Sequence, residues 1–150
     1  MIGRGADPNA VTADGKTSLH MALSTHKPAT AKHLIELGAT VDARDGTGRT
    51  PLMLAAEGGF EKVVKQLLER GAHLNARDDA GWTPLHFGAR KGSLVRLLVR
   101  RGSDVNARTV TGETALQLAL ARNDNPTAKF LIGQGAHVNT SVSALKQETQ

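Results

Sequence analysis

The sequence predicts an all-α repeat solenoid in which four helix-turn-helix units stack side by side. Three observations lead to this prediction. The pattern Gly-x-Thr-x-Leu begins at Gly15, Gly48, Gly81 and Gly112, in steps of 33, 33 and 31 residues. A second series of glycines, each preceded by an apolar pair, advances with the same period, which indicates a repeat architecture. Aromatic residues form only 3% of the chain, so burial depends on small and aliphatic side chains.

The threonine of each pattern predicts the start of a short first helix. A threonine hydroxyl can accept a hydrogen bond from a free N–H of the first turn, and proline is well tolerated at the first helical position. Thr50 and Thr83 are each followed by proline, and Thr114 with Gln117 has the spacing of a capping box. The first helices carry small side chains, which let neighbouring backbones approach.

A second helix follows in each unit, with apolar residues at helical spacing such as Val63, Val64, Leu67 and Leu68. It is expected to end at a glycine such as Gly71, which can take the left-handed conformation that closes a helix. Helices of about 8 to 10 residues are unstable alone in water. The units are therefore expected to depend on stacking.

The segment Asp-Asp-Ala-Gly-Trp-Thr-Pro-Leu-His at residues 78–86, with Gly-Ser-Asp-Val-Asn-Ala at 102–107, resembles the ankyrin repeat. The resemblance covers about residues 1–140 and implies L-shaped repeats with protruding β-hairpin turns. It divides the chain into the end of a preceding repeat (1–10), four repeats (11–44, 45–77, 78–108 and 109–140) and a polar tail (141–150). The resemblance also implies that motif histidines such as His20 and His86 hydrogen-bond between turns.

The chain departs from the regular pattern in two places. Met1 and Ile2 stand where other repeats carry the apolar pair before a closing glycine, so the chain is expected to begin inside a second helix as part of a longer protein. The third repeat is two residues short at the entry to its second helix, which predicts a helix shorter by half a turn with Ser93 as its N-cap. Gly88 replaces a helical alanine there, so this repeat is predicted to be the least stable.

Composition and spacing argue against metal binding and catalysis. The chain has no cysteine, which excludes disulfides and thiolate metal sites, and no window long and apolar enough to cross a membrane or to form a signal peptide. His73 and His137 are two repeats apart, too far to share one metal ion. Asp45 and Asp78 recur in the hairpins, which favours turn support or an ion pair between repeats over paired catalytic carboxylates. We expect no enzyme activity and no cofactor.

We therefore predict a protein-interaction module whose binding residues are those that vary between repeats. In the ankyrin family the hairpin tips and first helices line the concave side, and the resemblance carries this to eight numbered positions: Lys16, Arg49, Glu57, Trp82, Arg90, Lys91, Glu113 and Arg122. Their balance is basic, in a chain with 19 Lys and Arg against 14 Asp and Glu, so an acidic protein partner is expected. Trp82, the single tryptophan, is the leading hot-spot candidate, unless tryptophan is simply a common residue at this place.

Several alternatives stay open at this point. The basic groove could serve a nucleic-acid-associated domain, although interleaved aromatic residues are lacking, and the chain could be a structural spacer. Arg96, Arg100 and Arg101 are interpreted as a solvated convex face, and Arg44, Arg77 and Arg108 as framework. Asn75, Asn106 and Asn139 resemble hairpin asparagines that are hydroxylated in some animal members of the family. We expect a monomer in the cytoplasm or nucleus.

Overall fold

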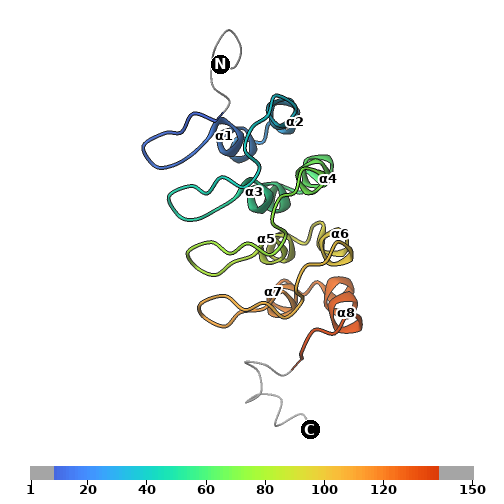
Figure 1. The fold of residues 1–150 in the computed structure, drawn as a ribbon. Helices are drawn as coiled ribbons and strands as arrows, with labels where there is room; N and C mark the ends of the chain where they lie inside the picture. Colours follow the sequence, from blue (N-terminus) through green and yellow to red (C-terminus); the bar gives the residue numbers. More distant parts are fainter. Residues whose placement is uncertain (1–8, 139–150) are drawn as a thin grey trace.

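The computed structural model describes residues 9–138, in which eight helices form four antiparallel pairs stacked in one direction (Figure 1). The expected preceding repeat and the polar tail lie largely outside the described residues. First helices form one row and second helices another, and the hairpins project from the first row. The helices are α1 (Ser18–Ser24), α2 (Pro28–Glu36), α3 (Pro51–Gly58), α4 (Glu61–Glu69), α5 (Pro84–Lys91), α6 (Val95–Arg100), α7 (Ala115–Ala121) and α8 (Asn125–Gly133).

Each first helix begins at a threonine, as predicted. The four cap residues have extended backbone and their side chains accept a hydrogen bond from the N–H three residues later: Thr17, Thr50, Thr83 and Thr114. In the fourth repeat the backbone N–H of Thr114 also donates to Gln117 Oε1 at 3.0 Å, which completes the predicted capping box. The closing glycine of the second repeat, Gly71, has a φ of +88°, as its place after the helix indicated.

The core is built from one leucine position on each row of helices. The first helices contribute leucines that are at most 1% exposed: Leu19, Leu52, Leu85 and Leu116. The second helices contribute leucines that are at most 2% exposed: Leu34, Leu67, Leu98 and Leu131. Complete burial of such a side chain contributes about 1.5–3 kcal/mol, so the repeated pattern supplies the same stabilising contact at every level of the stack.

The hairpins are tight turns connected to one another by backbone hydrogen bonds. The N–H groups of Gly46, Asp79 and Val110 donate to a carbonyl in the preceding hairpin at 2.7–2.9 Å. The turns do not extend into β-strands within residues 9–138, where the one bridge joins Val11 and Thr17. The predicted β-hairpins are therefore hairpin-shaped turns, because two backbone hydrogen bonds close each of them and no β-ladder extends from them in the described chain.

The third repeat departs from the prediction at its second helix. Helix α6 has six residues where α2, α4 and α8 have nine, a loss closer to a full turn than to half a turn. The predicted N-cap was wrong: the cap position is Leu94, whose backbone is left-handed and whose side chain caps nothing. Ser93 instead donates from its hydroxyl to the carbonyl of Ala56 at 3.0 Å, because this carbonyl at the end of α3 lies within its reach.

Gly88 is required by close packing. A methyl group added at this position would meet the carbonyl oxygen of Ser93 at 2.7 Å and a methyl carbon of Leu98 at 3.3 Å. The shortened connection brings the Ser93 backbone against α5, so the glycine accommodates the same deletion that shortens α6. Its cost in helix propensity is therefore compensated by the packing that it permits.

Helix α6 is predicted to exchange its backbone amides faster than α4. Neither helix has a side-chain cap, but α6 has six residues where α4 has nine and therefore forms fewer intrahelical hydrogen bonds. Hydrogen exchange followed residue by residue measures this difference, with α2 as the control for a nine-residue helix. Equal protection of α6 and α4 would contradict the prediction.

Gly88→Ala is predicted to lower the free energy of unfolding by about 1 kcal/mol or more, because the overpacking against Ser93 outweighs the gain in helix propensity. Urea denaturation measures the change. Ala55→Gly at the equivalent place in the second repeat is the matched control, and it should also destabilise the protein. A Gly88→Ala variant that is more stable than the native chain would refute the packing argument.

Candidate partner-binding surface

Two sets of polar side chains connect successive repeats through hydrogen bonds to backbone groups of the next repeat. The imidazole Nε2 atoms of His20 and His86 lie 2.9 and 3.0 Å from the carbonyl oxygens of Arg49 and Glu113, each in the next turn. This geometry agrees with the inter-turn role that the family resemblance implied. The cap N–H of Thr83 donates to His86 Nδ1 at 3.0 Å, which places the imidazole proton on Nε2.

A second connection uses an asparagine or aspartate in each hairpin. The side-chain oxygens accept the backbone N–H of a residue in the next repeat at 2.6–2.9 Å, in the pairs Asn9 with Thr40, Asp42 with His73, Asn75 with Asp104, and Asn106 with His137. The amide groups of Asn75 and Asn106 also donate to the carbonyls of Gly102 and Gly135. These side chains therefore belong to the framework, and Asn139 lies outside the described residues.

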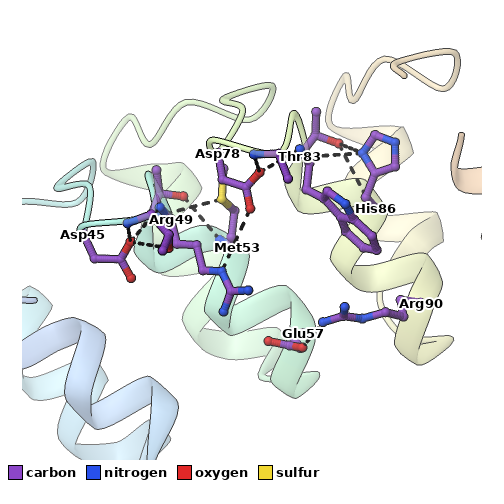
Figure 2. A network of polar contacts seen from close by, with 12 residues as sticks. Asp45, Arg49, Met53, Glu57, Asp78, Thr83, His86 and Arg90 are labelled. Atoms are coloured by element: carbon purple, nitrogen blue, oxygen red, sulfur yellow. Dashed lines mark hydrogen bonds and ion pairs between the residues drawn. The ribbon is translucent and has the colours of Figure 1, made fainter. Parts of the chain in front are cut away.

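The second repeat lacks the histidine connection. Met53 occupies the equivalent position, and its sulfur accepts the cap N–H of Thr50 at 3.4 Å (Figure 2). The connection to the third repeat is made instead by Arg49, whose Nε lies 3.9 Å from an oxygen of Asp78. This nitrogen is buried and has no hydrogen-bond partner in the described chain.

Asp45 and Asp78 support turns, as predicted. Asp45 Oδ1 accepts from the backbone N–H of Thr47 and of Arg49 at 2.9 and 3.0 Å, and Asp78 accepts in the same way from Ala80 and Trp82. Burial raises the pKa of Asp45, but these backbone hydrogen bonds outweigh it and hold the pKa below the ordinary value. Both carboxylates are therefore structural, and Asp78 adds the ion pair with Arg49.

An aromatic and arginine cluster forms where α5 meets α3. The half-buried Trp82 ring lies 5.1 Å from the Phe87 ring and 5.5 Å from the His86 ring, measured between centroids. The Arg90 guanidinium carbon lies 4.8 Å from the Trp82 centroid, and Arg90 also forms an ion pair with Glu57 (Figure 2). The contacts among Trp82, Phe87, Arg90 and Glu57 therefore restrain these four side chains.

Phe87 was missed by the sequence analysis. It is 1% exposed and lies beneath both arginines, with the guanidinium carbons of Arg49 and Arg90 each 5.4 Å from its centroid. The other repeats carry Met21, Leu54 and Leu118 at this position, so it varies between copies like the predicted site residues. That variation was the available signal.

A cavity of about 340 Å³ lies beside the cluster, between the ends of α1, α3 and α5. Its lining is Leu23, Ser24, His26, Arg49, Leu54, Glu57, Gly58 and Lys91. Three predicted site residues therefore meet there, and they bring two permanent positive charges and one negative charge. His26 adds an imidazole to the lining.

The other predicted site residues lie around this centre. Lys16 lies 3.9 Å from Asp14 in the first hairpin, and Arg122 donates to the carbonyl of Arg90 at 3.2 Å. The backbone of Glu113 accepts from His86, whereas its side chain has no ion pair within the described part of the chain. Arg49, Glu57, Trp82, Arg90, Lys91 and Arg122 therefore form a connected surface, which we call the hairpin face, and Lys16 and Glu113 flank it.

Comparison with known proteins decides the family. A family model described as "Ankyrin repeats (3 copies)" matches residues 1–78 and 74–142. The chain belongs to the ankyrin repeat family. No curated protein has a significant sequence match to this chain. Ankyrin repeats generally bind other proteins and are in general not enzymes, which agrees with the predicted class of function.

Metal-ligand clusters and membrane-spanning helices are both lacking in the described part of the chain. Among residues 9–138 there is no group of three or more His, Cys, Asp and Glu side chains arranged to hold a metal ion. None of the described helices is both long and apolar enough to cross a membrane.

His86→Gln is predicted to make the free energy of unfolding less dependent on pH. Burial lowers the pKa of His86 below its ordinary value of 6.5, so the unfolded chain takes up the proton first as the pH falls. The contribution of neutral His86 to the free energy of unfolding is therefore complete above about pH 6.5. It is lost progressively below that pH. Gln117 fills the equivalent position in the fourth repeat, so glutamine preserves the cap.

Urea denaturation of both proteins at about pH 7.5 and about pH 5.5 measures the difference. The variant should be less stable at the higher pH by about 1 kcal/mol, because its shorter side chain loses the bond to the Glu113 carbonyl. Its stability should then fall less between the two pH values. An equal fall in both proteins would show that His86 is not the titrating group.

Proposed function

We propose that this chain binds a partner protein on its hairpin face, with Trp82 as the central anchor. The supporting observation is the arrangement of Trp82 between Phe87 and Arg90, with Arg90 held by Glu57. Tryptophan and arginine are the residues most enriched in binding hot spots. Their mutual restraint reduces the conformational entropy that binding would otherwise cost.

We further propose that the partner is acidic at one point, where a carboxylate enters the cavity lined by Arg49 and Lys91. Arg49 Nε has no hydrogen-bond partner and is only at the limit of an ion pair with Asp78, so an incoming carboxylate would satisfy a buried donor. Lys91 is exposed at the end of α5. Arg90 is paired with Glu57, which reduces the overall attraction of the face for polyanions.

The cellular setting follows from the same proposal. A binding face without catalytic groups suits a regulatory or scaffold protein of which this domain is a part. We propose that it acts as a monomer in the cytoplasm or nucleus, in agreement with a chain that has no cysteine. A nucleic-acid partner is less well supported, because Trp82 is covered by Arg90 and Phe87 and no row of free rings follows it.

Trp82→Ala is predicted to weaken the complex with the principal partner by more than about 2 kcal/mol, because it removes the anchor of the face. The partner is first captured by the native protein, identified, and then titrated against both proteins by calorimetry. Leu37→Ala, at a 45% exposed leucine on the second-helix side, is the matched control and should leave the dissociation constant unchanged.

Thermal unfolding of both variants separates binding from stability. A Trp82→Ala protein that is folded and binds with an unchanged dissociation constant would refute the hairpin-face proposal. Binding that strengthens steeply as salt is lowered, and that is equal for unrelated nucleic acids, would favour the nucleic-acid hypothesis.

A further inference from the structure

Two cavities lie along the row of second helices, which Figure 1 shows on the side of the stack away from the hairpins. One cavity of about 470 Å³ is formed by α2 and α4, and a second of about 440 Å³ by α4, α6 and α8. Glu61 and Lys65 line both, so the two cavities are adjacent. We call them together the outer groove. Of the residues that the structure describes, none lines both the outer groove and the cavity at Arg49.

The second cavity exists because the third repeat is short. Helix α6 begins at Val95 and lacks the first turn that α4 and α8 possess. Leu94 and Gly92 line the space where that turn would lie, opposite Glu61 of α4 and Thr127 of α8. The deletion therefore opens the row of second helices at its centre, and Leu94 enters it with a left-handed backbone.

The lining of the outer groove is strongly basic. It contains one acidic residue, Glu61, and five basic residues: Lys32, Lys62, Lys65, Arg96 and Arg100. Lys65 lies 3.0 Å from Glu61, whereas Lys32, Lys62 and Arg100 have no ion pair within residues 9–138. The lining carries a formal charge of +4 in a chain whose net charge is +5. The outer groove is therefore one of the basic surfaces of this protein.

The floor of the groove is apolar. Phe60 and Val63 lie in the first cavity, and Leu94, Val95 and Leu97 lie in the second. An occupant must therefore bring apolar side chains to the floor and negative charges to the rim. A partly apolar, acidic protein segment has both, whereas a nucleic-acid backbone provides only the charge.

The aromatic rings near the groove are already engaged. Phe60 meets His26 edge to face with 5.8 Å between centroids, and the Arg96 guanidinium carbon lies 4.7 Å from the centroid of Phe130. Stacking of bases on free rings is the usual basis of single-strand binding. Neither of these rings is free to stack on a base, which favours a protein segment over a nucleic acid.

We propose that the outer groove is a second docking site, which binds an acidic, amphipathic segment of a protein. Helices packed at about 10 Å from one another place α8 about 30 Å from α2, a distance that an extended segment of about nine residues spans. The site is separate from the hairpin face, so the domain can hold two proteins at once. Arg96 and Arg100 thus have a binding role in place of the solvated one that the sequence suggested.

The test uses a fluorescein-labelled peptide of about ten alternating Glu and Leu residues, long enough to span the groove when extended. Its binding to the full chain is followed by fluorescence anisotropy. A double variant, Lys32→Gln with Arg100→Gln, removes two unpaired charges from the groove and should weaken binding at least about fivefold. Ala29→Trp fills the first cavity at an exposed position without a change of charge, and should weaken it similarly.

The matched control is Lys129→Gln with Arg101→Gln, which removes the same charge from exposed positions outside the lining and should change binding less than about twofold. Trp82→Ala should leave peptide binding unchanged, so failure here and failure of the hairpin-face proposal are distinguishable. Equal weakening by both double variants, tighter binding of an oligothymidylate of similar length, or no binding of the peptide would each overturn the proposal.

Discussion

The contact between one repeat and the next is the interaction on which the rest of this structure depends. No helix of the described chain exceeds nine residues, a length at which an isolated helix is unstable in water. Stability comes instead from leucines buried at the same place in every repeat and from hydrogen bonds that cross between hairpins. Because each repeat contacts only its neighbours, a local irregularity can be accommodated without loss of the stack.

The irregularities meet at the junction of the second and third repeats. Met53 cannot make the bond that His20 and His86 make, and the Arg49 pair with Asp78 connects the repeats instead. The same arginine then lies against Phe87. The third repeat is also two residues short just after α5. This deletion shortens α6 and opens the outer groove. Both proposed binding surfaces thus arise where the framework departs from its own repeat.

Local interactions account for what could be predicted from the sequence. A threonine cap, an inter-turn histidine and a hairpin aspartate each depend on partners at a constant offset, so one copy of the repeat explains the others. The prediction that Ser93 caps its own helix was wrong, because its hydroxyl donates to the Ala56 carbonyl of the preceding repeat instead. The stacking of Phe87 under two arginines, and the meeting of residues around the cavity at Arg49, required neighbours that no single repeat contains.

The two surfaces differ in the physical term that would dominate binding. On the hairpin face Arg49 and Arg90 each have a carboxylate partner, whereas Lys91 and Arg122 have none within the described chain, and Trp82 adds an apolar anchor. In the outer groove the charges of Lys32, Lys62 and Arg100 are not compensated within the described chain. Uncompensated charge accelerates association and is screened by salt, whereas an apolar anchor acts mainly on the dissociation rate. Binding to the outer groove should therefore depend on ionic strength more strongly than binding to the hairpin face, where part of the positive charge is already paired.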